Sequence, residues 1–322
     1  MNNVLPYSNC FLCPRRCGID REHTSGYCKE SAALSIACAS IHRGEEPPIT
    51  GAGGSGTIFI SGCNLGCVFC QNWQISMGLA SMSNPLGRAV DKAEFAHICL
   101  ALQEKGAKNI NIVTGSHAVP AIVKGIAAAK AAGLAVPVLW NSSAYELPET
   151  LDLLFDTVDV FLPDIKTMDK SIAGQFFNAP EYPKIAASAI KKMLEMRSLR
   201  FLKDNSGTAR LASGVMVRHL VLPGCLKATR DVLRWFAKNC KGRSLLSLMF
   251  QFTPIHDKGP SRYINRSEYE TVLGWLGEFG IEEGYCQEFA PGNTGWLPDF
   301  KKNNPFPSDL SLPVWHWKIG FI

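Results

Sequence analysis

The sequence predicts an α/β protein in which helices cover a parallel sheet, built as a partial (β/α)6 barrel or as an open wound sheet. Short apolar segments alternate with amphipathic segments along residues 57–279, and this alternation is typical of parallel strands joined by crossover helices. Gly106 and Gly133 follow the first two helical segments, and a glycine is a common helix end. Six strand–helix units are fewer than the eight of a closed barrel, so we expect the sheet to stay open.

Each expected element rests on its own pattern of apolar residues. The strands are short and rich in apolar residues, as buried parallel strands require: residues 57–61, 109–114, 134–140, 159–162, 216–222 and 245–250. The helices have apolar residues at helical spacing or are rich in alanine: residues 91–105, 119–132, 147–155, 182–196, 229–240 and 266–279.

Length and composition indicate a folded globular protein. The chain has 322 residues, of which 46% are hydrophobic and 19% charged, so it is long enough to bury a substantial core. No apolar run reaches the roughly 18–20 residues of a membrane span, and the N-terminus lacks a signal-peptide core, so we expect a cytoplasmic protein without membrane contact. We expect three parts: a cysteine-rich, metal-binding N-terminal appendage (1–50), a core (51–290) and a Pro- and Trp-rich C-terminal tail (291–322) packed on the core.

Three cysteines directly after the first predicted strand give the chain its most specific signal. Cys63, Cys67 and Cys70 form a Cys-x3-Cys-x2-Cys run. Three thiolates at this spacing can hold one iron–sulfur cube but leave its fourth iron open, and an open iron can bind a substrate and pass it an electron. Five other cysteines stand alone in the sequence, and lone cysteines usually act as small hydrophobic residues.

A second group of cysteines precedes this run. Cys10, Cys13, Cys17 and Cys28 offer four thiolates, enough to close a metal site. A tetrahedral zinc site would brace the appendage, whereas a second [4Fe-4S] cluster could relay electrons or bind substrate. The spacing differs from the paired cysteines of simple zinc ribbons, so both metals stay open, with free structural thiols as the third alternative.

Polar residues follow the predicted strands where each one ends. In parallel sheets the carboxyl ends of the strands form the ligand crevice, so these side chains should converge on whatever binds the open iron. Each is weak evidence alone, because Asp164 and Lys166 could be a surface pair and His219 a core histidine. The candidates are Gly115, Ser116, Asn141, Asp164, Lys166, Arg218, His219 and, more weakly, Gln251.

Charge is unevenly distributed. Residues 184–243 hold 14 Lys and Arg against 3 Asp and Glu, although the whole chain carries a net charge of +5. Solvated helix faces account for most of these residues, and aromatic residues are not interleaved with them as a nucleic-acid surface would require. We therefore expect no nucleic-acid partner and favour a protein that docks on a basic rim.

These motifs together resemble the radical S-adenosylmethionine (SAM) superfamily. The cysteine loop with Phe69 before its last cysteine carries the general likeness. Six further segments resemble the uncharacterised superfamily members related to pyruvate formate-lyase activating enzyme: CFLCPRRCGIDR, GEEPPITG, GSGTIFISGCNLGCVFCQNWQIS, LPDIK, VRHLVLPG and SLMFQFTP. The resemblance extends from Cys10 to Gln287 and implies a partial barrel of the radical SAM type.

The resemblance implies a cofactor and a reaction. Cys63, Cys67 and Cys70 would hold a [4Fe-4S] cluster whose open iron binds SAM. An electron from a reductant such as flavodoxin or ferredoxin would cleave SAM to methionine and a 5′-deoxyadenosyl radical, which abstracts hydrogen from a substrate. The protein would orient the reactants and exclude water.

The resemblance also implies contacts to SAM, residue by residue. Phe69 would lie near the adenine, Asn141 on the ribose side, and Arg218 and His219 at the methionine end. Asp164 would bind the ribose hydroxyls or the ammonium group, and Lys166 the carboxylate. Gly115 and Ser116 stand where relatives have a Gly-Gly-Glu strand end, but this chain has no glutamate there.

Three functions stay open for the chain. One is activation of a glycyl radical enzyme, with that protein as partner and substrate. The second is radical chemistry on a small molecule or a peptide. The third is a non-catalytic iron–sulfur protein, against which the incomplete cysteine ligation argues.

Overall fold

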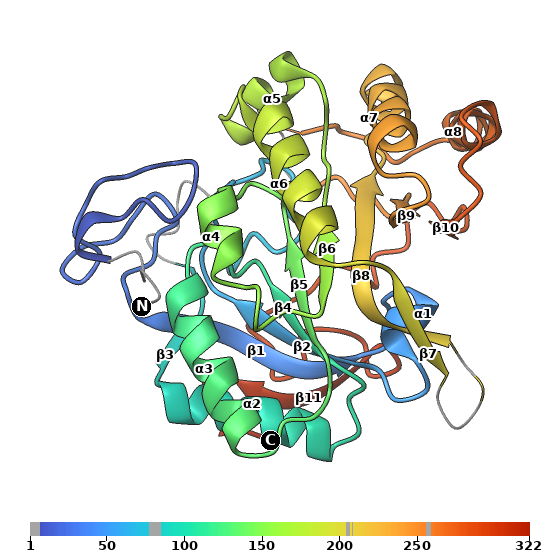
Figure 1. Ribbon diagram of the computed structural model, residues 1–322. Coiled ribbons are helices and arrows are strands. Elements are labelled where there is room, and N and C mark those ends of the chain that lie inside the picture. The colour runs from blue at the N-terminus through green and yellow to red at the C-terminus, as the bar shows by residue number, and fades with distance from the viewer. Residues whose placement is uncertain (1–6, 77–84, 204–206, 208, 256–258) are drawn as a thin grey trace.

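A sheet whose strand order follows the chain order forms the centre of the molecule (Figure 1). The computed structural model describes residues 7–76, 85–203, 207, 209–255 and 259–322. Neighbouring strands run β10-β9-β8-β6-β5-β4-β2-β1-β11-β12, and along this order each pair between β2 and β10 is parallel, while β7 adds an antiparallel pair with β8. Since every crossover moves in the same direction, the sheet is singly wound and curls as a partial barrel, which confirms the predicted fold class.

All six predicted strands are present in this parallel part. They are β2 (Ser55–Ile60), β4 (Ile110–Val113), β5 (Val138–Ser142), β6 (Val160–Pro163), β8 (Ala209–Leu220) and β9 (Leu245–Met249). A further parallel strand, β10 (Gly284–Cys286), extends the edge beside β9. The strands are buried on both faces, which is why their sequences read as continuous apolar runs.

The six predicted helices are also present and lie around the outside of the curved sheet (Figure 1). Two have clear start signals: the Asp91 side chain accepts from Glu94 N at the start of α2, and Asn265 and Glu268 form a capping box at α8. The helices are α2 (Lys92–Glu104), α3 (Val119–Ala131), α4 (Pro148–Asp152), α6 (Tyr182–Met196), α7 (Leu226–Asn239) and α8 (Arg266–Glu278).

Several short elements were not predicted. Helix α5 (Lys170–Phe177) has eight residues, too few for a clear helical period, and α1 (Pro47–Thr50) is a single turn. The others are the 3-10 helix η1 (Tyr7–Asn9) and the strands β1 (Leu34–His42), β3 (Arg88–Val90), β7 (Arg200–Lys203), β11 (Ser311–His316) and β12 (Gly320–Phe321).

Antiparallel strands complete the sheet on the β2 side. β1 pairs with β2, and β11 from the C-terminal tail pairs with β1, so the sheet begins inside the segment that the sequence assigned to the appendage. Phe300 and Phe306 from the tail pack against Phe59 of β2 with ring centroids 5.3 and 5.5 Å away. The tail thus packs on the core, as predicted. No helix in the described part of the chain is long and apolar enough to cross a membrane.

Candidate functional site

The three cysteines after β2 face a single cavity of about 640 Å³. The chain leaves β2 through Gly62, whose φ is +82°, and a Cβ there would lie 2.4 Å from Glu30 Cγ and 2.8 Å from Cys28 O. Glycine is therefore required by both conformation and space. From this turn Cys63, Cys67 and Cys70 follow at the carboxyl end of the strand and line the cavity.

The cysteine loop fits a four-iron cluster. Burial raises the pKa of the Cys67 thiol, Cys70 and Cys63 raise it further, and only Lys166 lowers it, so the three sulfurs lie close enough to interact. Within the described residues no three Cys, His, Asp or Glu side chains meet at the coordination distance of a single ion. A cubane binds each cysteine through a different iron, so its three thiolates stand apart around one cavity, as they do here.

Five of the residues predicted to contact SAM line the same cavity: Phe69, Asn141, Asp164, Lys166 and Arg218. Lys166 Nζ lies 2.8 Å from Asp164 Oδ2. Burial acts to lower the pKa of Lys166, but Asp164 and Cys67 outweigh it and raise the pKa, which keeps the ammonium charged. The Phe69 ring is held edge-on by Phe176, Phe177 and Phe252, with centroids 5.7 to 6.0 Å apart.

Gly115 and Ser116 are not among the residues that line the cavity. The Ser116 hydroxyl instead donates to Glu146 Oε1 at 2.7 Å. Trp140 Nε1 and the Ser142 hydroxyl donate to the same buried carboxylate, at 2.6 and 2.8 Å. Sequence reasoning missed Glu146 because it comes from the loop after β5, whereas the glutamate expected from relatives would follow β4 directly.

His219 also lies away from the cavity wall, in a buried polar contact. Its Nδ1 lies 2.7 Å from Ile165 O and must donate, so Nε2 accepts from the Thr229 hydroxyl at 3.0 Å. Burial lowers the pKa of His219 to about 4, so the ring is neutral at pH 7. The structure therefore places it as a core histidine between β8 and α7, the structural alternative that the sequence left open.

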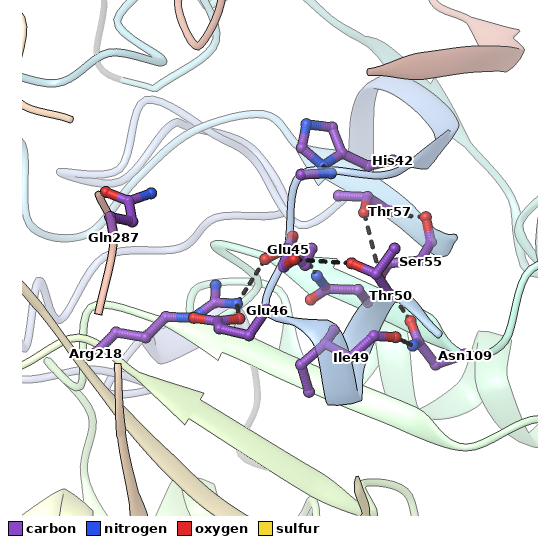
Figure 2. Close-up of polar contacts among 12 residues, drawn as sticks. His42, Glu45, Glu46, Ile49, Thr50, Ser55, Thr57, Asn109, Arg218 and Gln287 are labelled. Atoms are coloured by element: carbon purple, nitrogen blue, oxygen red, sulfur yellow. Dashed lines mark hydrogen bonds and ion pairs between the residues drawn. The ribbon is translucent and has the colours of Figure 1, made fainter. Parts of the chain in front are cut away.

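Arg218, the residue before His219, reaches two carboxylates that sequence reasoning did not single out (Figure 2). Its Nε donates to Glu46 Oε1 at 2.9 Å, and its Nη2 donates to Glu45 Oε2 at 2.5 Å and also to Glu46 Oε2. Burial acts to raise the pKa of Glu46, but Arg218 lowers it below its usual range. Both glutamates line the cavity, and the signal for them was the doublet in the GEEPPITG segment.

The turn that carries these glutamates is itself held by hydrogen bonds (Figure 2). Asn111 Nδ2 of β4 donates to Glu45 Oε1 at 2.9 Å, and the Thr50 hydroxyl donates to Glu45 O at 2.9 Å. Asn109 Nδ2 donates to Ile49 O at 2.7 Å, which ties α1 to the start of β4. Glu45 and Glu46 therefore lie at the amino end of the barrel interior, opposite the cysteines.

The four N-terminal cysteines lie outside this cavity but next to the core cysteine loop. Cys10, Cys13 and Cys28 are buried and Cys17 is half-buried. Burial raises the pKa of Cys13 to about 12 and that of Cys28 to about 11, with neighbouring cysteines adding to both. Cys28 O accepts from Cys63 N at 3.3 Å, so the two loops are in backbone contact.

Comparison with known proteins gives one family and several distant structures. The sequence model of the Radical SAM superfamily matches residues 57–205. The uncharacterized protein MJ0674 of Methanocaldococcus jannaschii is 30% identical over 270 residues, which cover 83% of this chain and 72% of that protein.

Among solved structures, Streptococcus suis SuiB bound to S-adenosylmethionine has a TM-score of 0.48 at 10% identity over 73% of this chain, which spans 50% of SuiB. A domain of the pyruvate-formate lyase-activating enzyme from Bacteroides vulgatus has a TM-score of 0.39 at 14% identity, covering 53% of this chain and 91% of that domain.

Proposed function

Because the chain belongs to the radical SAM superfamily, we propose that it is an enzyme that cleaves SAM reductively and uses the resulting 5′-deoxyadenosyl radical to abstract hydrogen. The single observation that carries this proposal is the convergence of Cys63, Cys67 and Cys70 on one cavity at the carboxyl end of β2. When bound there, a [4Fe-4S] cluster supplies the electron, which a flavodoxin or ferredoxin delivers.

The charged residues on the cavity wall support a SAM subsite beside the cysteines. Lys166 is held as an ammonium by Asp164 and lies within electrostatic reach of Cys67. It would bind the SAM carboxylate, while Asp164 and Asn141 would take the ribose hydroxyls or the ammonium. Phe69 would contact the adenine, with its ring position set by three neighbouring phenylalanines.

The other residues predicted to contact SAM have supporting roles in this proposal. Ser116 positions Glu146. Gly115 allows Ile122 and Trp140 to pack against the backbone after β4, since a Cβ there would lie 2.7 Å from both Ile122 Cδ1 and Trp140 Cη2. His219 braces β8 against α7. The Arg218 guanidinium already donates to Glu45 and Glu46, so in this proposal its main task is to hold these two carboxylates and not to bind the methionine end of SAM.

For the N-terminal cysteines we propose a second metal site, zinc or iron–sulfur, that braces the core cysteine loop. No three of these described thiols meet at the coordination distance of a single ion, which favours a cluster over zinc. The contact between Cys28 O and Cys63 N supports this role. The electropositive Arg21, whose Nη1 lies 3.7 Å from Cys10 Sγ, suits a site that carries excess thiolate charge.

The substrate is the finer part of the proposal. A glycyl radical enzyme would be activated by hydrogen abstraction from a glycine of a partner protein, and a small molecule or peptide would react inside the cavity. The volume of about 640 Å³, shared with SAM, suits a short peptide loop or a small molecule equally well.

Anaerobic reconstitution tests the function directly. The protein should take up about four irons on the core loop and release 5′-deoxyadenosine from SAM under reduction. Cys67→Ala should lose both properties and keep its circular dichroism spectrum. Cys225→Ala, a half-buried cysteine away from the cavity, is the matched control and should cleave SAM like the wild type. SAM cleavage by Cys67→Ala at the wild-type rate would contradict the assignment.

A further inference from the structure

The floor of the cavity holds an unequal number of buried charges. Two carboxylates, Glu45 and Glu46, share one guanidinium, that of Arg218, and their side chains are 13%, 10% and 7% exposed. These three side chains therefore carry a formal net charge of −1, and a substrate bound in the cavity would exclude water from them. Buried charge that is left without a partner is costly, so the floor favours an occupant that brings one positive charge.

The floor adjoins the proposed SAM subsite within the same cavity. The backbone of Asp164, just after β6, forms a β-bridge with that of Arg218 in β8, and the Lys166 side chain pairs with Asp164 on the cysteine side. Going along the wall, the order is the cysteines, Lys166 with Asp164, Arg218, and then the two glutamates. A ligand on the floor would thus lie across the SAM subsite from the cluster, where a substrate must lie.

The parts of the wall around the floor come from segments outside the family match to residues 57–205. Glu45 and Glu46 precede that match, and Arg218 and Tyr285 follow it. The tail contributes an apolar side, with Phe306 packed on His42 at 4.9 Å between ring centroids and Trp296 close to Gly44. Arg218 lies on the core strand β8, but the glutamates and the tail residues come from segments attached to the shared core, where substrate selection is expected.

One further group on the floor can donate to a ligand. Arg218 uses Nε and Nη2 for the glutamates, and within the described part of the chain Nη1 makes no hydrogen bond. Nη1 is also not among the buried atoms without a partner, so it opens on the cavity. It can donate to an oxygen of a ligand whose cationic group binds the carboxylates.

We propose that Glu45 and Glu46 bind a primary ammonium group of the substrate, so that the enzyme acts on amines or on lysine side chains. The proposal rests on the proposed function, because it identifies the floor as the substrate end of the radical site. Arg218 holds the two carboxylates in position, and the apolar side formed by the tail accommodates the carbon chain next to the ammonium group.

Calorimetric binding to the reconstituted, SAM-bound protein tests the charge preference with matched probes. One pair is n-hexylamine and hexan-1-ol, and the other is N-acetyl-Gly-Lys-Gly-amide and its Nε-acetyllysine form. At pH 7.5 the wild type should bind the cationic member of at least one pair 10-fold or more tighter. The first pair represents a small-molecule substrate and the second a peptide. If the wild type binds the cationic and the neutral probe of each pair with equal affinity, this measurement alone overturns the proposal.

Glu45→Gln is the sharpest variant, because it changes the floor from −1 to 0 and leaves no charge unpaired. Glu46 still pairs with Arg218 through both oxygens, and the new amide oxygen can still accept from Asn111. The preference for the cationic probe should fall to less than 3-fold. Glu104→Gln, an equal charge change at an exposed position on α2, should keep the wild-type preference. A preference that persists in Glu45→Gln overturns the proposal.

The outcome also separates this proposal from the proposed function. Wild-type protein that cleaves SAM but shows no charge preference overturns only the ammonium site. Wild-type protein that shows the preference but does not cleave SAM under reduction overturns the radical function, and with it the role of the floor as a radical substrate site.

Discussion

The two cysteine loops of this protein lie in contact but are positioned in different ways. The core loop with Cys63, Cys67 and Cys70 directly continues strand β2, and its thiols line the cavity. The N-terminal loop with Cys10 and Cys28 has no strand of its own and is held by arginines that donate to backbone carbonyls. A loop that continues a parallel strand places its side chains at the ligand crevice. The N-terminal loop packs against the core from outside, and its cysteines do not line the cavity.

The contact between the loops is made mainly by two arginines and one histidine. Arg15 donates to Asn64 O and Leu65 O, each at 2.9 Å. Arg21 donates to His117 O at 2.7 Å, and His117 Nε2 in turn donates to Ser61 O at 2.8 Å. The N-terminal loop therefore supports the backbone that carries the core cysteines.

The largest expected effect comes from removing the three core thiols together. A variant with Ala at 63, 67 and 70 should lose SAM cleavage entirely and keep metal in the N-terminal loop, because that loop supplies its own four ligands. Elemental analysis after reconstitution then distinguishes the metals: residual zinc indicates a brace, and residual iron indicates a second cluster. Loss of all metal in a folded variant would show that the loops do not form independent sites.

Arg21→Met should destabilise the N-terminal loop strongly. Besides His117 O, the guanidinium satisfies Glu30 O and Ser31 O, at 3.1 and 2.6 Å. Glu30 O also accepts from Gly26 N, but leaving the His117 and Ser31 carbonyls unpaired beside an uncompensated cavity should lower the free energy of unfolding by roughly 3–5 kcal/mol. Urea unfolding of the metal-free protein measures this loss. Arg16→Met is the matched control at an exposed position, where a change below about 0.5 kcal/mol is expected.

His117 should make the contact between the loops sensitive to acid. Burial, with a further contribution from Arg21, lowers its pKa to about 3, against about 6.5 in the unfolded chain. As the pH falls below 6.5 the unfolded state binds the proton first, so stability present at pH 7 is lost toward pH 3. At pH 5 the loss from this residue should be about 2 kcal/mol.

The test compares the free energy of unfolding at pH 7 and pH 5 in the wild type and in His117→Gln. The contributions of all other titrating groups cancel in the difference between the two proteins. The variant should lose less stability between the two pH values. His23→Gln, an exposed histidine in the N-terminal loop, should retain the wild-type pH dependence. An unchanged pH dependence in His117→Gln would mean that residue 117 does not titrate in the unfolding transition as inferred.

Arg15→Met should have the smallest effect of the four. Its guanidinium also donates to Phe177 O and Asn178 O, at 2.9 and 2.7 Å, but the residue is partly exposed and water can replace these bonds. We expect a loss of about 1–2 kcal/mol. Hydrogen exchange at the Asn64 and Leu65 amides should accelerate. Unchanged exchange there would show that the core loop keeps its conformation without support from the N-terminal side.

Local patterns accounted for most of the fold. All six core strands and their helices were predictable because each has an apolar run or a helical period within its own residues. Strands β1 and β11 were not, because their pairing joins opposite ends of the chain, which a local sequence pattern does not reveal. The cysteine loop was predictable as a group, since its three residues lie within eight positions of sequence.

The sequence by itself determined the parallel sheet, the core cysteine loop and the order of polar groups at the strand ends. Only the tertiary structure decided which of those groups face the cavity. Arg218 and His219 are neighbours on β8, and successive side chains on a strand point to opposite faces, so one reaches the cavity and the other packs toward α7. Glu45 and Glu46 reach Arg218 because β1 pairs with β2, which places the turn that follows β1 at the amino end of the barrel.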